Sequence, residues 1–276
     1  MTEPRTPTTA RTPAAPRATD AAMRRTARIA GVLYLLTFVS IPTLGLYNPI
    51  RDHADFILGA GSDTGVLWGA LSEVVVGIAG ISTAVVLFPV VRRQSETAAV
   101  GLLAARLLET TLIFVSVVSL LTIVTLRTDV AGTAGADNAS LTTTGHTLLA
   151  VYDRTFLVSQ SLMPVFVDLL LGYLLFRSGL VPRILPLIAF VGAPLLLASD
   201  LAVFFGVYTN VSTLAVLAAV PVAVFELSFG IYLIARGFRP SSPLMAQPNT
   251  AVGVPVVIPA PRTSATQLDE RGAEIS

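Results

Sequence analysis

The stretch VLWGALSEVVVGIAGISTAVVLFPVV runs from Val66 to Val91 and contains one ionisable side chain, Glu73. An α-helix needs about 20 predominantly apolar residues to cross the roughly 30 Å of hydrocarbon in a bilayer. The stretch therefore predicts a transmembrane helix. Five further apolar stretches reach the required length, so we predict six spans. These spans are Ile29–Tyr47, Val66–Val91, Ala98–Leu126, Thr155–Phe176, Ile184–Phe205 and Leu214–Ala235.

The composition agrees with lipid as the solvent for much of the chain. Apolar residues make up 53% of it and charged residues only 13%, whereas a soluble domain has about 25% charged residues. The mean hydropathy is +0.75. We therefore predict an all-α integral membrane protein, a single six-helix bundle whose partner is the lipid bilayer, with other membrane proteins as further possible partners and no nucleic acid.

The residue types restrict the chemistry of the protein. All 18 basic residues are arginine, which indicates GC-rich coding and a bacterial source. The chain has no cysteine, which excludes disulfides, a thiolate nucleophile and a cysteine metal site. The histidines, His53 and His146, are expected in solvated loops, far from the three or four ligands that a metal site needs. We predict no catalytic residues, no metal and no cofactor.

Arginine also predicts the orientation, because positively charged short loops stay in the cytoplasm. One side of the spans carries nine flanking arginines, namely Arg24, Arg25, Arg28, Arg92, Arg93, Arg177, Arg183, Arg236 and Arg239. The other side carries Arg51, Arg127 and Arg154. We therefore predict a multi-pass protein of the bacterial inner membrane with both termini in the cytoplasm.

The transmembrane domain is predicted over residues 24–239, between two tails. Residues 1–23 and 240–276 are rich in proline and lack apolar periodicity, which predicts disordered cytoplasmic tails. Between the third and fourth spans, Arg127–His146 is rich in Gly, Ala, Thr and Asp. We predict that it forms an exposed loop.

Four stretches resemble one bacterial membrane family. They are RIAGVLYLLTF from Arg28, GYLLFRSGLVPRILP from Gly172 to Pro186, LLLASDLAVFF around Asp200, and FELSFGIYLIARGF from Phe225 to Phe238. Their order resembles the family catalogued as domain of unknown function 4386. The resemblance covers about three quarters of the chain and implies a six-span helical membrane protein of uncharacterised activity. It transfers no catalytic residue, and Leu197, Ala198 and Ser199 replace the tyrosine that is common before the aspartate.

Ionisable side chains inside the spans are the candidate functional residues, because a charge at the bilayer centre costs about 2.5–3.5 kcal/mol on insertion scales. They are Glu73, Arg106, Glu109, Asp168, Asp200 and Glu226. A rise of about 1.5 Å per residue places Arg106, Glu109, Asp168 and Glu226 roughly 9 to 14 Å deep from the cytoplasmic end. Glu73 and Asp200 lie higher, at about 21 to 27 Å. We predict an inner polar cluster and two outer-half acids that face the bundle interior.

Arg106 and Glu109 share a helix face at i,i+3 spacing. Because a guanidinium keeps its proton, we expect Arg106 to contact a carboxylate on another helix as well, either Asp168 or Glu226. Two interpretations of the cluster stay open. The carboxylates could form a relay or ion site, or Arg106 could neutralise one or two acids and hold helices together.

A stripe of glycines accompanies Glu73 at helical spacing, namely Gly69, Gly77 and Gly80. Small residues favour close helix packing, and they could also leave room for a substrate. Three functions follow from these features. The first is a small transporter or carrier that uses intramembrane carboxylates, the second a non-catalytic membrane scaffold or partner protein, and the third, ranked last, an intramembrane enzyme.

Overall fold

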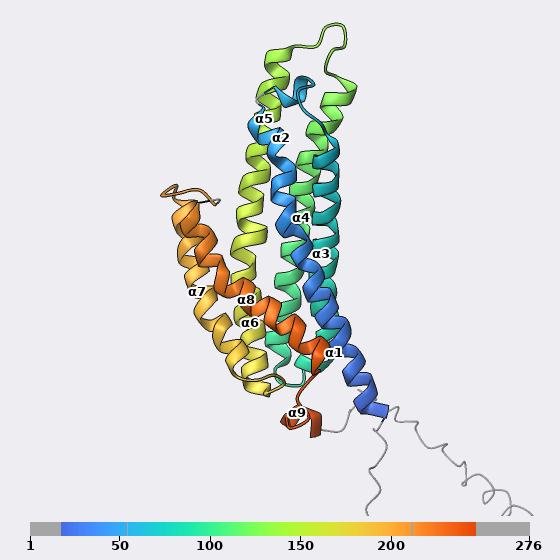
Figure 1. Cartoon of the computed structure of the whole chain (residues 1–276), viewed down its shortest axis with the longest axis vertical. Helices are drawn as coiled ribbons and strands as arrows, with labels where there is room; N and C mark the ends of the chain where they lie inside the picture. The colour runs from blue at the N-terminus through green and yellow to red at the C-terminus, as the bar shows by residue number, and fades with distance from the viewer. Residues whose placement is uncertain (1–17, 54, 211, 247–276) are drawn as a thin grey trace, which may run out of the picture. The chain divides into compact units, whose positions relative to one another are not determined.

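Residues 18–53, 55–210 and 212–246 are described by the computed structural model (Figure 1), and within these ranges the chain contains helices but no strand. The elements are α1 (Ala18–Leu36), η1 (Thr37–Tyr47), α2 (Asn48–Asp52), η2 (Phe56–Leu58), α3 (Thr64–Val91), α4 (Glu96–Asp129), α5 (Asn138–Phe156), η3 (Leu157–Leu162), α6 (Met163–Ser178), α7 (Ile184–Phe204), α8 (Thr213–Ala235) and α9 (Pro243–Ala246). η1 and η2 are 3-10 helices, and η3 is a π-helix.

Five helices among the described residues are long and apolar enough to cross a membrane. They are Thr64–Val91, Glu96–Asp129, Asn138–Ser178, Ile184–Phe204 and Thr213–Ala235. Large apolar side chains lie exposed on their outer surfaces, among them Trp68, Val118 and Val191. This surface is typical of a protein solvated by lipid. The first predicted span, Ile29–Tyr47, consists of the second half of α1 followed by η1.

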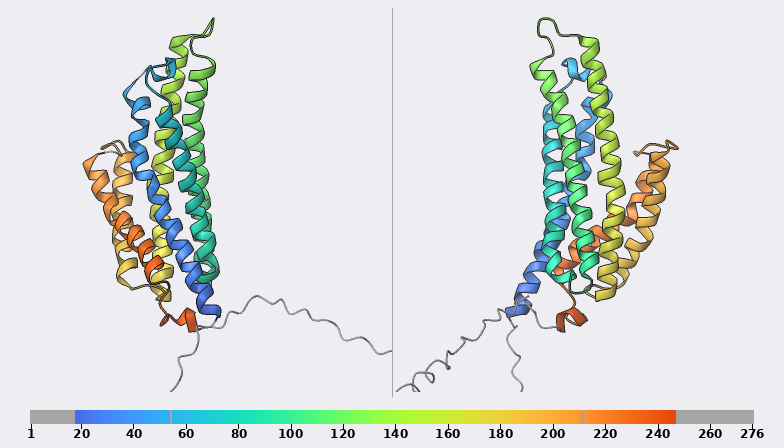
Figure 2. Two further views of the ribbon diagram at one scale, coloured as in Figure 1. Left: turned by 45° about the vertical axis from the view of Figure 1, so that its right-hand side comes forward. Right: turned by 180° about the vertical axis from the view of Figure 1, so that it is seen from behind.

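The long helices of the described residues form a closed ring of contacts. α1 contacts α3, α3 contacts α4, α4 contacts α6, α6 contacts α7, α7 contacts α8, and α8 returns to α1. Figures 1 and 2 show α7 and α8 as a pair on one side of α3, α4 and α5. Because the sequence of contacts closes, polar side chains on the inner faces of different helices can meet.

The contact between α1 and α8 depends on two glycines. A Cβ atom built on Gly31 would lie 2.6 Å from the carbonyl oxygen of Gly230, and one built on Gly230 would lie 3.2 Å from the carbonyl oxygen of Gly31. Real Cβ atoms essentially never approach to 2.6 Å, and 3.2 Å is tighter than most real contacts, so the backbones cross where neither residue has a side chain. Small residues at a helix crossing serve this purpose in membranes.

The loop predicted over Arg127–His146 is shorter in the structure, so the prediction is wrong at both ends. α4 continues to Asp129, and α5 begins at Asn138. The Asp137 carboxylate accepts a hydrogen bond from the backbone N–H of Ala139 at 3.1 Å and so caps the first turn of α5. Gly145 of α5 packs against Ile57. Packing on a neighbouring segment thus stabilises a helix that lacks an apolar run in its own sequence.

The predicted tails also differ from the structure where the structure describes them. α1 begins at Ala18, and α9 follows α8 in the sequence. The Ser242 hydroxyl donates to the carbonyl of Ser178 at 2.7 Å, and Arg93 donates to the carbonyl of Leu244 at 2.6 Å. These bonds attach α9 to the helix ends. The rest of residues 1–23 and 240–276 lies outside the described residues.

Candidate functional site

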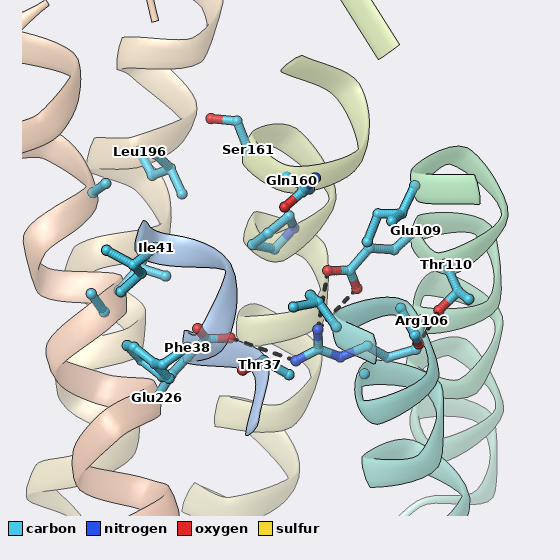
Figure 3. Close-up of a pocket in the computed structure, with 18 residues that line it drawn as sticks. Thr37, Phe38, Ile41, Arg106, Glu109, Thr110, Gln160, Ser161, Leu196 and Glu226 are labelled. Atoms are coloured by element: carbon cyan, nitrogen blue, oxygen red, sulfur yellow. Dashed lines mark hydrogen bonds and ion pairs between the residues drawn. The ribbon is translucent and has the colours of Figure 1, made fainter. Parts of the chain in front are cut away.

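Arg106 of α4 is the centre of a buried polar network and is only 4% exposed. Its Nη1 atom donates to both carboxylate oxygens of Glu109, at 2.9 and 3.1 Å. Its Nη2 atom donates to the hydroxyl of Tyr34 at 3.0 Å and lies 3.5 Å from Oε1 of Glu226. One guanidinium therefore connects α4 with α1 and α8. Figure 3 shows its contacts with Glu109 and Glu226.

The backbone of α3 makes room for this network. A Cβ atom on Gly80 would lie 3.7 Å from Nη1 of Arg106, so the guanidinium passes over a residue without a side chain. One turn earlier, the carbonyl of Gly77 accepts a hydrogen bond from the hydroxyl of Thr110 at 2.9 Å. Gly69 instead faces the ring of Tyr47. The glycines thus serve helix packing and leave room for the Arg106 side chain, and Gly77 and Gly80 also border a cavity.

The cavity next to Arg106 has a volume of about 200 Å³ and is partly open. Its walls come from η1, α3, α4, η3, α6, α7 and α8. Apolar side chains form much of the surface, among them Phe38, Ile41 and Leu196. The polar lining includes Arg106, Glu109, Thr110, Gln160, Ser161 and Glu226 (Figure 3). An apolar pocket with a few convergent polar groups is typical of a small-molecule site.

Asp168 of α6 does not join the ion pairs of the inner cluster. It is 0% exposed, and neither of its carboxyl oxygens has a hydrogen-bond partner among the described residues. It lies within electrostatic reach of Arg106, Glu109 and Glu226 but does not line the cavity. The structure therefore brings three of the four predicted inner residues into contact and leaves the fourth beside them.

The outer-half acids are both buried, Glu73 at 1% and Asp200 at 5% exposure. The hydroxyl of Tyr152 donates to Oε1 of Glu73 at 2.7 Å. Asp200 accepts a hydrogen bond from the hydroxyl of Ser161. π-Helical turns are rare and occur frequently at functional sites. Here the π-helix η3 carries Gln160 and Ser161, which line the cavity, and Ser161 also bonds to Asp200.

Several buried polar atoms around Glu73 have no hydrogen-bond partner among the described residues. They are Oε2 of Glu73, the hydroxyl of Tyr47 and Nε2 of Gln160. Unpaired buried polar atoms cost about 1–3 kcal/mol each, so water or a ligand is the usual partner at such a position. The outer acids therefore belong to a second polar region that borders the same cavity.

Sequence reasoning missed the tyrosines of the site and the role of η3. Tyr34 and Tyr152 are fully buried and supply the hydroxyl groups that bond to Arg106 and Glu73. A hydroxyl in an apolar helix needs a partner, and that need is a signal that could have identified them. No group of three or more His, Cys, Asp or Glu residues in the described ranges could hold a metal ion.

A family model with the description "Domain of unknown function (DUF4386)" matches residues 29–237, which is more than half of the chain. This match confirms the resemblance noted from the sequence. No curated protein and no solved structure matches the chain. The geometry of the site is therefore the main guide to its function.

Proposed function

Because the chain belongs to the family described as Domain of unknown function (DUF4386), which names no activity, we propose from the site geometry that it is a membrane carrier for a small solute. The observation behind this proposal is the partly open cavity at the Arg106 network. A scaffold can pack its buried charges shut, whereas a carrier must let water and solute reach them. A volume of about 200 Å³ is well above the ~10–15 Å³ that holds one water molecule.

The charges of the cavity suggest the class of solute. Two carboxyl groups, those of Glu109 and Glu226, face the single guanidinium of Arg106. With both acids ionised, the network carries one excess negative charge. It becomes neutral when one acid binds a proton or when a cation enters the cavity. We therefore propose a small organic cation with an apolar body, which exchanges with a proton on Glu226.

Glu226 is the better candidate for this exchange than Glu109. Glu109 receives two short hydrogen bonds from Arg106, and its side chain is 9% exposed. The Glu226 oxygen lies 3.5 Å from the guanidinium, and its side chain is 17% exposed. The acid that is held less tightly and is more accessible can release or bind a proton with less disturbance of the network.

A membrane arrangement of six spans with both termini in the cytoplasm is part of the proposal. At a rise of ~1.5 Å per residue α1 is about 28 Å long, and at ~2.0 Å per residue η1 is about 22 Å long. Together they are long enough for a sixth crossing. A cysteine-free chain permits a direct test. In intact bacterial cells, Ala136→Cys in the α4–α5 loop should react with an impermeant thiol reagent, and Gln94→Cys between α3 and α4 should not. The reverse pattern would refute this orientation.

Proteoliposomes that contain the purified protein and a trapped pH-sensitive dye test the exchange. Tetramethylammonium and tetraethylammonium should drive proton movement, while pivalate, an apolar anion of similar size, should not. Glu226→Gln keeps the shape of the side chain but cannot exchange a proton, so it should abolish the response. Glu96→Gln is a matched control because Glu96 is exposed in the first turn of α4.

Three outcomes would contradict the proposal. Protein-containing and empty vesicles could respond alike to every ion, as a scaffold would require. Glu226→Gln could respond like the unchanged protein. Pivalate could drive proton movement as well as the cations do, which would show that the charge of the cavity does not select the solute.

A further inference from the structure

A second cavity lies at the ends of α1 and α8, and it shares no lining residue with the Arg106 site. Its volume is about 410 Å³. Two arginines line it, Arg24 from α1 and Arg236 just beyond the end of α8. The rest of the wall is Ala21, Met23, Phe238, Pro240 and Met245. The two arginine side chains thus line one cavity whose other lining residues are apolar.

The glycine crossing of α1 and α8 sets the positions of the two arginines. Arg24 precedes Gly31 by seven residues, and Arg236 follows Gly230 by six. At about 1.5 Å per residue, each arginine lies roughly 9 to 11 Å from the crossing along the chain. Both line one cavity, so the two helices run in opposite directions at this point and bring the arginines to the same end.

The segment after α8 completes the wall and is held in place. Gly237 has a φ of +69°, a conformation that glycine adopts without strain, and it turns the chain after α8. Phe238 is buried. The backbone N–H of Arg239 donates to the carbonyl of Leu180 at 2.8 Å. Together with the hydrogen bonds from Ser242 to Ser178 and from Arg93 to Leu244, these contacts make the cavity a built feature of the fold.

Neither Arg24 nor Arg236 makes an ion pair or a side-chain hydrogen bond within the described part of the chain. The ion pairs there involve Arg51 and Arg106 only. An arginine guanidinium presents several N–H donors in a planar arrangement that matches the oxygens of a phosphate. Two of them at one cavity form a complementary site for a phosphate, and Met23, Phe238 and Met245 offer apolar surface beside it.

We propose that this cavity binds a phosphate group, carried either by the headgroup of an anionic lipid or by a free anion. Both arginines lie where the apolar stretches of α1 and α8 end. Lipid headgroups occupy this level of a membrane, and basic pockets between transmembrane helices bind them. The apolar wall would then lie beside the glycerol and the first acyl carbons.

Purified protein in detergent permits the test with defined probes. Water-soluble dihexanoyl phosphatidylglycerol should raise the Tm, because a ligand that binds only the folded state stabilises it. Dihexanoylglycerol, which lacks the phosphate, should have no effect. The double variant R24Q/R236Q should weaken binding about tenfold or more, since hydrogen bonds to charged groups contribute about 1.5–3 kcal/mol.

The matched control is R25Q/R177Q, which removes the same charge from two exposed arginines outside the cavity. It should bind phosphatidylglycerol within about twofold of the unchanged protein. Inorganic phosphate distinguishes the sources, because a comparable effect of phosphate alone would assign the site to a free anion. Equal weakening in both double variants, or no effect of any phosphate compound, would overturn the proposal. Both double variants should keep the Tm of the unchanged protein without ligand, which separates a binding defect from misfolding.

Discussion

Replacing Arg106 by glutamine should destabilise the protein more than any loss of a surface charge. Arg106 holds Glu109 through two hydrogen bonds at 2.9 and 3.1 Å, contacts Glu226 at 3.5 Å and donates to Tyr34 at 3.0 Å. The substitution leaves two buried acids without their cation. Removal of one partner of a buried pair costs about 3–5 kcal/mol when the remaining charge stays ionised, and less when it takes up a proton.

A double-mutant cycle separates the Arg106–Glu109 interaction from the cost of leaving an acid without its cation. Unfolding of R106Q, E109Q and R106Q/E109Q should be followed in detergent, and the double variant should recover part of the loss. Contacting residues couple by about 0.5–3 kcal/mol, and we expect the upper half of this range. The control cycle uses Arg51 and Asp153, an ion pair at 2.6 Å with side chains 31% and 37% exposed. An exposed pair contributes about 0–1 kcal/mol. Coupling at Arg106 no larger than at Arg51 would refute the reasoning.

Two further predictions concern helix packing and the outer acids. Gly31→Leu should lower the free energy of unfolding by about 1–3 kcal/mol, because the new Cβ would lie 2.6 Å from the carbonyl oxygen of Gly230. Gly101→Ala, where the Cβ would meet ordinary contacts at 3.6 Å, is the control, and an equal loss there would contradict the crossing. Tyr152→Phe removes the donor to Glu73 and should cost about 1–3 kcal/mol in the same unfolding assay. An unchanged stability would mean that this hydrogen bond contributes nothing.

The apolar runs predict most of the fold because a bilayer demands length and hydrophobicity in each span. The second span was expected from Val66 to Val91 and is a helix over Thr64–Val91. The fifth was expected from Ile184 to Phe205 and is a helix over Ile184–Phe204. The same principle also identified the ionisable residues of the site, since each is an exception within an apolar run.

Features that depend on neighbours could not be predicted from the chain alone. The first half of α5 has a polar, threonine-rich sequence, and its packing on Ile57 involves a residue far away in the chain. The π-helix at Leu157–Leu162 has no signature in the sequence pattern. Equally, spacing along α4 placed Glu109 beside Arg106, but only the fold selects Glu226 over Asp168 as the partner on another helix.

Access of water to the cavity is the central claim of the proposed function, and cysteine labelling measures it most directly. Ala223 lines the cavity, whereas Ala189 is fully buried in the apolar core. In the cysteine-free chain, Ala223→Cys should react with a small water-soluble thiol reagent, and tetraethylammonium should slow the reaction. Ala189→Cys should stay unreacted. Equal resistance of both variants to the reagent, with the protein folded, would show a closed polar core and contradict the carrier.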